Sequence, residues 1–300
     1  MTPANVTDAV SRFSAASSPR ARLREAASTS IVWCAAAMIF GLVAWILAGL
    51  VWGGISGVSW SFLVTAPSNG GRAGGLAPIL VSTLAILAIC LAVTVPLGLG
   101  TALLLSEFTL RETRFSRVVR FSLDVLAGIP SIVFGLFGNA FFSITLGLGF
   151  SILSGGLTLA CMALPLFIRA TEEGLRAVPD DYRKAGAALG VAQAKTIRRV
   201  ILPAAAPGII VGLVLAIGRA LAETAALIFT SGYVDRMPSS VLDSGRALSI
   251  HIYDLAMNVP GGDRNAYAST LVLIGLLLII NLLASVLTER WLGRRVLAVQ

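Results

Sequence analysis

The sequence predicts an all-α, polytopic membrane protein with six transmembrane helices, a cytoplasmic loop that carries a short docking helix, and both termini in the cytoplasm. Hydrophobic residues make up 56% of the 300 residues, and charged residues make up only 13%. Several uncharged runs exceed the roughly 20 residues that a helix needs to cross a bilayer. These runs are continuously apolar rather than alternating, which favours helices over a transmembrane β-barrel.

The first predicted span is 31–52, a run without charged residues. It is too long for the apolar core of a cleavable signal sequence, so we expect it to remain as a membrane anchor. Residues 1–30 are rich in Ser, Ala and Arg and are expected to form a poorly ordered cytoplasmic tail. The second span lies in the uncharged run 73–106, and its helix is expected to begin near Pro78.

The third and fourth spans share the uncharged run 125–168. As one helix this run would be roughly 66 Å long, about twice the hydrocarbon thickness of a bilayer. We therefore expect the chain to fold back at the turn-rich segment 143–151. The fifth span is expected from about Pro203 to Ser231, and the sixth lies in the uncharged run 266–288.

The orientation follows from the Lys and Arg residues in the connections between spans. The sides that include both tails and the loop 169–203 carry 18 of these residues, whereas the opposite sides carry 4. Positive charge is retained on the cytoplasmic side, so both tails and this loop are expected there. The net charge of +8 is then explained by anionic lipid as a partner, with no need for nucleic acid.

Nucleotide, metal and enzyme sites are not expected in this chain. It has two lysines, Lys184 and Lys195, and neither follows a glycine, so a Walker A loop is absent. The single histidine, His251, and three cysteines within predicted spans do not form a zinc pattern. Since no nucleophile motif accompanies His251, we expect neither a cofactor nor a catalytic residue.

The charged loop 169–203 predicts a short helix over 180–190. Asp180 and Asp181 can cap it, and Gly190 supplies a C-terminal stop. One apolar face follows the spacing i, i+3, i+4, i+7, with Tyr182, Ala185, Gly186 and Leu189. A helix this short is marginal alone in water, so we expect that face to dock onto a partner.

Four charged residues lie where charge is costly in a membrane: Arg169, Glu172, Arg219 and Glu223. Arg219 and Glu223 are expected to share one helix face. One interpretation is that these residues form ion pairs that lock the bundle. The other is an anion path, because an arginine binds a tetrahedral oxyanion through two hydrogen bonds. A nearby carboxylate accepts a hydrogen bond from a protonated anion, which would favour hydrogen phosphate over sulfate.

These residues resemble a known family. The loop is similar to the EAA signature of type I ABC-importer membrane subunits, with Lys184-Ala185-Gly186 at the triplet, then Gly190 and Ile201-Leu202-Pro203. Three further segments resemble phosphate-specific permeases of this family: Leu126–Gly138, Leu164–Glu173 running into Val178-Pro179, and Glu223–Leu227. The resemblance covers about 78–290, a single permease domain. Lys184 replaces the acidic residue of the triplet, and Ala226 replaces a proline.

The resemblance implies a subunit of an ATP-driven importer in the cytoplasmic (inner) membrane, which forms half of a path for inorganic phosphate. It implies three partners, namely a second permease subunit, a cytoplasmic ATPase dimer that hydrolyses the ATP, and an external phosphate-binding protein. It also implies that the helix at 180–190 is a coupling helix in a cleft of the ATPase, through Asp181, Tyr182, Lys184, Ala185, Gly186, Leu189 and Gly190. Two alternatives stay open: a permease for molybdate or sulfate, and a membrane anchor or channel without transport.

Overall fold

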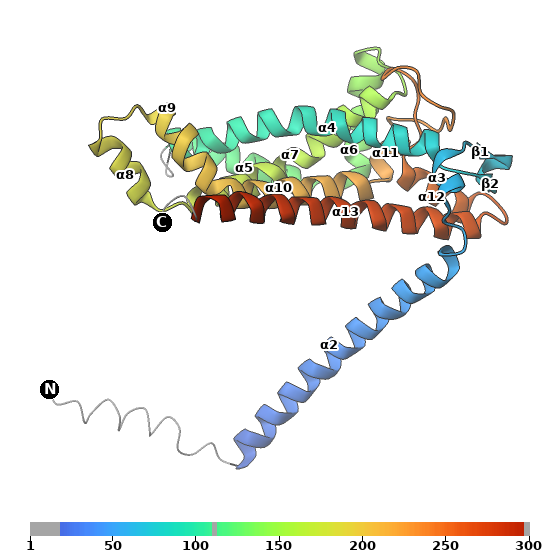
Figure 1. The fold of residues 1–300 in the computed structure, drawn as a ribbon, viewed down its shortest axis with the longest axis horizontal. Helices are drawn as coiled ribbons and strands as arrows, with labels where there is room; N and C mark the ends of the chain where they lie inside the picture. Colours follow the sequence, from blue (N-terminus) through green and yellow to red (C-terminus); the bar gives the residue numbers. More distant parts are fainter. Residues whose placement is uncertain (1–18, 110–112, 297–300) are drawn as a thin grey trace. The chain divides into compact units, whose positions relative to one another are not determined.

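The computed structural model describes residues 19–109 and 113–296, which are mostly helical (Figure 1). The chain divides into two compact units, residues 1–52 and residues 53–300. Within the described ranges, five helices are long and apolar enough to cross a membrane: Ala27–Gly54, Ala77–Phe108, Ile152–Arg176, Gln193–Ala222 and Asp263–Val286. A sixth crossing results if a sharply bent pair of helices counts as one span. The predicted all-α membrane class is therefore confirmed.

Helix α2 (Pro19–Gly54) contains the first predicted span. Its large apolar side chains, including Trp33, Phe40 and Trp45, are exposed, as suits a helix surrounded by lipid. Residues 19–30 were expected to belong to the poorly ordered tail, but they already form part of this helix. Their Arg, Leu, Glu and Ala residues favour helix, which explains the earlier start. The remainder of the predicted tail, 1–18, lies outside the described residues.

The core of the second unit is built around α7 (Ile152–Arg176), which packs against α4 (Ala77–Leu103) and α10 (Leu202–Ala222). The last helix, α13 (Asp263–Val296), packs against α10, and the four helices run side by side in Figure 1. The main apolar cluster joins buried side chains from α4, α7 and α10, among them Ile86, Cys90, Leu159, Phe167, Ala216 and Ile217. Helices α4, α7 and α13 lie where the second, fourth and sixth spans were predicted.

The backbones of α7 and α10 touch through two glycines, Gly174 and Gly208. A Cβ atom on Gly208 would lie 2.4 Å from the Cα of Gly174, and a Cβ atom on Gly174 would lie 2.8 Å from the Cα of Gly208. Neither position can therefore carry a side chain unless the helices separate. Small residues at such a crossing allow close packing of membrane helices, and here they set the closest approach of the pair.

The third span is broken rather than continuous. Helix α5 (Arg114–Gly128) and the helical segment Ser131–Thr145, which comprises α6 (Ser131–Gly138) and the π-helical η3 (Asn139–Thr145), are bent by 100°. The single helix expected from residue 125 to the fold-back is therefore wrong. Pro130 disfavours helical angles at the residue before it, and Ile129 is extended with φ −71° and ψ 131°.

The predicted fold-back at 143–151 is confirmed. The helical segment ends at Thr145, and Gly147 and Gly149 have positive φ angles of 69° and 61°, which glycine adopts most easily. Ser151 then caps α7, because its side-chain oxygen accepts a hydrogen bond from the backbone N–H of Ser154. Local turn residues are sufficient to explain this reversal.

The loop after α7 contains the predicted short helix. Helix α8 covers Asp180–Ala188, and α9 (Gln193–Thr196) continues through the π-helical turn η4 (Ile197–Ile201) into α10. The fifth span therefore begins at Gln193, earlier than the predicted Pro203. This proline is tolerated directly after a π-helical turn, where the regular hydrogen-bond ladder is already interrupted.

The opposite end of the second unit carries the shorter elements (Figure 1). They are α3 (Trp60–Val64), the strands β1 (Pro67–Ser68) and β2 (Ala73–Gly74), and α12 (Leu248–Met257). The strands pair antiparallel, with Pro67 opposite Gly74 and Ser68 opposite Ala73, around the turn η1 (Asn69–Gly71). Helices α8 and α9 lie at the other end of the bundle, so the unit presents two distinct faces.

Candidate functional site

The structure does not place Arg219 and Glu223 on one helix face. Helix α10 ends at Ala222, and Glu223 is extended with φ −76° and ψ 128°. A short helix, α11 (Ala225–Ile228), follows after this break. The predicted shared face is therefore wrong, and so is the predicted continuation of the span to Ser231.

Glu223 holds the break through both its side chain and its backbone. Its Oε1 atom accepts a hydrogen bond of 3.2 Å from the backbone N–H of Ala226, one of the donors left open at the start of α11. Its backbone carbonyl accepts a hydrogen bond of 2.6 Å from the hydroxyl of Ser249 on α12. Glu223 is buried, and within residues 19–109 and 113–296 it has no ion pair with Arg219.

Arg219 lies in the last turn of α10 and borders a small cavity of about 90 Å³. The other lining residues come from α5, α6 and α7, namely Leu126, Ala127, Phe134, Met162, Pro165 and Leu166. These side chains are apolar, and in the part of the chain that the structure describes Arg219 has neither a hydrogen bond nor an ion pair. The side chain is exposed at the surface of this single chain. Its positive charge is thus available to a ligand or a partner.

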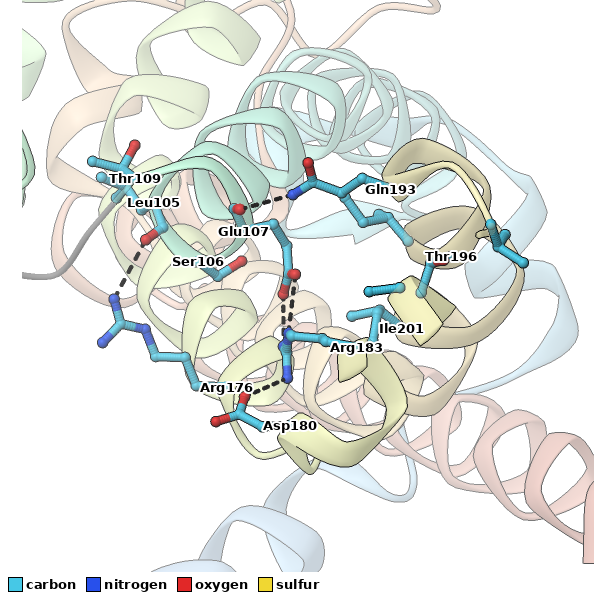
Figure 2. Close-up of a pocket in the computed structure, with 13 residues that line it drawn as sticks. Leu105, Ser106, Glu107, Thr109, Arg176, Asp180, Arg183, Gln193, Thr196 and Ile201 are labelled. Atoms are coloured by element: carbon cyan, nitrogen blue, oxygen red, sulfur yellow. Dashed lines mark hydrogen bonds and ion pairs between the residues drawn. The ribbon is translucent and has the colours of Figure 1, made fainter. Parts of the chain in front are cut away.

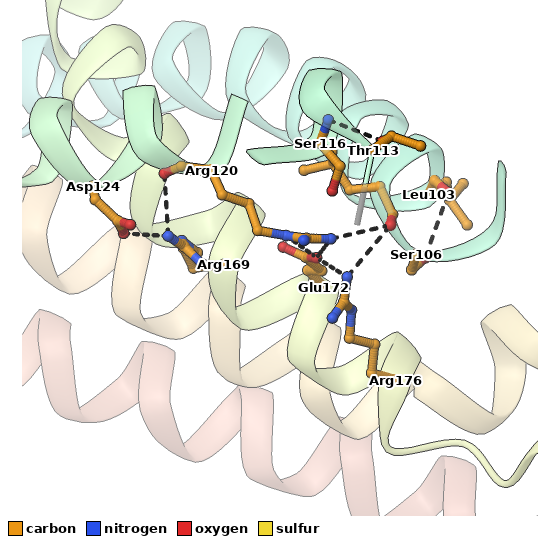
Figure 3. A network of polar contacts seen from close by, with 10 residues as sticks. Leu103, Ser106, Thr113, Ser116, Arg120, Asp124, Arg169, Glu172 and Arg176 are labelled. Carbon is orange, nitrogen blue, oxygen red and sulfur yellow. Dashed lines mark hydrogen bonds and ion pairs between the residues drawn. The ribbon is translucent and has the colours of Figure 1, made fainter. Parts of the chain in front are cut away.

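Glu172 has the opposite environment (Figure 3). It is 4% exposed on α7, and its Oε1 atom is 2.9 Å from Nη2 of Arg120 on α5 and 2.5 Å from Nη2 of Arg176. Both guanidinium groups also donate to the backbone carbonyl of Leu105, over 3.5 Å from Arg120 and 3.4 Å from Arg176. Glu172 is thus a buried carboxylate that joins α5 to α7.

Arg169 makes a second connection between the same helices. Its guanidinium forms an ion pair with Asp124 of α5 and donates a hydrogen bond of 3.2 Å to the backbone carbonyl of Arg120. Arg169 and Glu172 therefore do not pair with each other, and each one binds α5. This geometry matches the locking interpretation that the sequence left open for these two residues.

The partners of Arg169 and Glu172 were not identified from the sequence. Arg120 and Asp124 are four residues apart and share one face of α5, so their spacing carried a usable signal. It was hidden because α5 was not expected as a separate amphipathic helix. The pairs span 52 and 45 positions in the sequence, and such distances are not readable from local patterns.

Helix α8 exposes most of the predicted docking face. Tyr182 is 50% exposed and Leu189 is 80% exposed, and Ala185 is exposed between them. Gly186 points inward instead, since a Cβ atom there would lie 2.7 Å from the hydroxyl oxygen of Thr196. Gly190 follows the helix with a positive φ of 67°, as expected of a C-terminal stop.

The charged residues of α8 only partly follow the prediction. Asp180 and Asp181 do not cap the helix, because Pro179 occupies the N-cap position; both carboxylates lie in the first turn, where they favour the helix dipole. Lys184, at the acidic position of the motif, is exposed and lies 3.7 Å from Asp181. Such an exposed pair contributes little to stability.

Arg183 on α8 has a role that no local sequence pattern indicated (Figure 2). Its Nε and Nη2 atoms donate to the two carboxylate oxygens of Glu107, over 3.0 Å and 2.6 Å. Hydrogen bonding to Glu107 raises the pKa of the Arg183 guanidinium further above its usual value. Glu107 belongs to η2 (Leu104–Phe108), the π-helical turn that ends α4. The pair borders an open cavity of about 770 Å³ between η2 and the helices α8 and α9.

His251 lies on α12 and is 1% exposed. Burial lowers its pKa to about 4, and the nearby charge of Arg246 acts in the same direction, so the imidazole is neutral at neutral pH. Its Nδ1 atom has no hydrogen-bond partner among the described residues. Arg246 pairs with Asp254 over 3.3 Å. Across 19–109 and 113–296, no group of three His, Cys, Asp or Glu side chains could hold a metal ion.

The sequence is similar to that of membrane transport subunits. Residues 94–297 match the family described as binding-protein-dependent transport system inner membrane component. A probable ABC transporter permease protein of Bacillus subtilis, YqgI, is 31% identical over 287 residues, which cover 91% of this chain and 96% of that protein. The phosphate transport system permease protein PstA 1 of Mycobacterium tuberculosis is 40% identical over 217 residues, which cover 72% of this chain and 70% of that protein.

Solved structures with the same fold are also ABC transporters. The inward-facing MetNI methionine transporter matches with a TM-score of 0.57 and 18% identity over 71% of this chain and 96% of the matched chain. A bacterial alginate transporter in complex with its pentasaccharide-bound periplasmic protein matches with a TM-score of 0.63 and 17% identity over 88% of this chain and 96% of that chain. At these identities the comparison shows the fold alone.

Proposed function

Because the chain belongs to the family of binding-protein-dependent transport system inner membrane components, we propose that it forms half of the translocation path for inorganic phosphate in an ATP-driven importer. Several relatives are phosphate transport system permeases, including PstA 1 of Mycobacterium tuberculosis and PstA of Yersinia pestis. The importer would reside in the cytoplasmic membrane. In this role the chain moves the anion and leaves ATP hydrolysis to a partner.

The observation that carries the phosphate assignment is the unpaired Arg219. A charged side chain within a span costs several kcal/mol unless water, a ligand or another charge meets it. Arg219 has no such partner among the described residues, although it lies beside an apolar cavity. A guanidinium group forms two parallel hydrogen bonds with a tetrahedral oxyanion, so an anion passing this point supplies the missing partner.

The other charged residues named in the sequence would support this path rather than line it. Glu223 holds the break after α10 through Ala226 and Ser249, which fixes the end of the helix that carries Arg219. Arg169 and Glu172 bind α5 to α7, whose residues form part of the cavity wall. We assign these three residues to the positioning of the path and Arg219 to contact with the anion.

The partners are proposed from the exposed surfaces and from the family. The outward face of α8 would enter a cleft of a cytoplasmic ATPase dimer, through Tyr182, Ala185 and Leu189, with Asp181, Lys184 and Gly190 beside them and Gly186 seating the helix on Thr196. A second permease subunit would complete the path, and an external binding protein would deliver phosphate. Both termini and α8 would then lie on the cytoplasmic side.

Uptake by the complete complex in vesicles tests this function. With the second permease, the ATPase and the binding protein present, we expect ATP-dependent uptake of phosphate that arsenate inhibits and that sulfate and molybdate do not. Uptake of molybdate or sulfate in place of phosphate would identify another oxyanion as the substrate. Complete absence of ATP-dependent uptake would favour an anchor or a channel.

A substitution tests the role of Arg219 within the same complex. Arg219→Gln removes the charge while keeping a polar side chain, and we expect uptake to fall at least about tenfold with the complex still assembled. Arg236→Gln is a suitable control, since Arg236 is an exposed arginine outside the spans. Normal uptake by Arg219→Gln would remove Arg219 from the path.

A further inference from the structure

Helix α8 is held in place mainly by the hydrogen bonds of one side chain, and only to a small extent by burial of its own residues. None of the residues in α8 is buried. Arg183 reaches inward from it and donates hydrogen bonds to two backbone carbonyls at the end of α7, over 2.9 Å to Leu175 and 2.8 Å to Val178. The same guanidinium holds both carboxylate oxygens of Glu107 and contacts Asp180 over 3.1 Å. Arg183 thus joins α8 to two membrane helices.

The cavity beside α8 explains why this connection matters. Its lining includes Ser106 of η2 together with Ala187 of α8 and Ile197 of η4. The space between α8 and η2 is therefore not filled by apolar side chains. The pair of Arg183 and Glu107, together with a hydrogen bond of 3.1 Å from Gln193 to the Glu107 carbonyl, bridges it.

The turn η2 also meets the second charged cluster. The carbonyl of Leu105, two residues before Glu107, accepts hydrogen bonds from Arg120 and Arg176, and both of these arginines bind Glu172 (Figure 3). One π-helical turn at the end of α4 is therefore connected to α8 on one side and to α5 and α7 on the other. This places η2 between the exposed loop and the helices that line the Arg219 cavity.

We propose that Arg183 and Glu107 are the positioning pair that transmits displacement of α8 to η2 and, through Leu105, to α5 and α7. This inference rests on the proposed function, in which a partner ATPase moves α8. The Glu107 side chain is 4% exposed, so separation from Arg183 would leave a buried charge unpaired. The two-pronged contact also fixes direction as well as distance, which a single hydrogen bond does not.

The test compares Glu107→Gln and Arg183→Gln in the assembled complex. We expect each variant to retain the co-purified ATPase and its hydrolysis, while phosphate uptake per ATP hydrolysed falls about tenfold. The double variant should be no worse than either single variant, because residues that act as a pair are not additive. Glu173→Gln and Arg198→Gln are matched controls at exposed positions, and both should keep the wild-type ratio.

A second measurement does not depend on the substrate. Spin labels at Ala188→Cys on α8 and Leu97→Cys on α4, both exposed positions, report the separation of the two helices in a background without native cysteines. We expect a narrow distance distribution in the assembled complex and a broader one for Glu107→Gln and Arg183→Gln. The controls should retain the narrow distribution.

The outcomes separate this inference from the proposed function. Failure of the wild-type complex to take up phosphate would overturn the function, and the label distances would still decide whether the pair positions α8. Unchanged distances in both variants would overturn the inference. The inference would also be overturned if the effects of the two single variants multiplied in the double variant. Loss of the ATPase from the complex would overturn it too, because that result would indicate a docking role for the pair.

Discussion

The charged residues around Glu172 and those at the end of α10 differ in whether their side chains have partners of opposite charge. Around Glu172, five charged residues of α5 and α7 each meet an opposite charge or a backbone carbonyl: Arg120, Asp124, Arg169, Glu172 and Arg176. At the end of α10, Arg219 meets none among the described residues, and Glu223, four positions later, is used as a cap. The first region connects helices, whereas the second keeps a charge available. The position of a charged residue within a span does not show whether its role is structural or functional. The presence or absence of a partner for its side chain distinguishes the two.

The largest effect is expected from removing the carboxylate that joins α5 to α7. Glu172→Gln leaves two arginines facing a neutral amide, and the loss of a buried ion pair costs about 3–5 kcal/mol. We expect the complex to assemble poorly and its thermal midpoint to fall sharply. Thermal unfolding followed by size-exclusion chromatography measures both.

Substitutions of two neighbouring carboxylates provide a comparison for the loss of stability in Glu172→Gln. Asp124, which pairs with Arg169, has a side chain that is 64% exposed, so Asp124→Asn should cost less than about 1 kcal/mol. Glu173→Gln, an exposed position beside Glu172, should cost nothing measurable. If Glu172→Gln were no more harmful than these two, the first region would not hold the helices together.

A smaller effect is expected from His251, a buried residue whose Nδ1 atom has no hydrogen-bond partner among the described residues. Its folded-state pKa is lowered to about 4 from the usual 6.5, so the unfolded chain binds a proton that the folded chain does not. The stabilisation is present above pH 6.5 and is lost as the pH falls towards 4, by roughly 3 kcal/mol in total. The thermal midpoint measured between pH 7 and pH 4.5 should therefore fall less steeply in His251→Gln than in the wild type. Equal slopes would show that the pKa of His251 is not lowered in the folded protein.

The smallest effect in free energy is expected from Arg219→Lys. Lysine keeps the positive charge but offers a single ammonium group in place of the two-pronged guanidinium. We expect the rate of uptake at a saturating concentration of loaded binding protein to fall about tenfold, or about 1.4 kcal/mol, with the thermal midpoint unchanged. Initial rates of uptake at a fixed, excess concentration of loaded binding protein measure this. A lowered thermal midpoint without a change in uptake would show that Arg219 connects helices, as the charged residues around Glu172 do.

The predictions from sequence succeeded where local signals were complete. The spans around α4, α7 and α13 are uncharged runs with clear ends, and the glycines before Ser151 marked the fold-back. Helix α8 was expected from its apolar spacing and from Gly190. In these segments the residues that form an element also determine where it ends.

The failures occurred where distant residues decide the structure. Helix α10 stops at Ala222 although apolar residues continue after it, and the break is held by Ser249, which is 26 positions away from Glu223. The bend at Pro130 lay inside an uninterrupted apolar run, so charge patterns gave no sign of it. The partners of Glu172 and the link between Arg183 and Glu107 are contacts between elements, and a single sequence does not record them.

The glycine contact between α7 and α10 has a mechanical consequence. With bare backbone on both sides, no side chain at Gly174 or Gly208 can change rotamer to let the helices slide past each other. On α7, roughly 3 Å of helix extends beyond Gly174 towards α8, so the contact lies close to the loop. A displacement of the loop would therefore be passed to α7 and α10 together rather than absorbed between them.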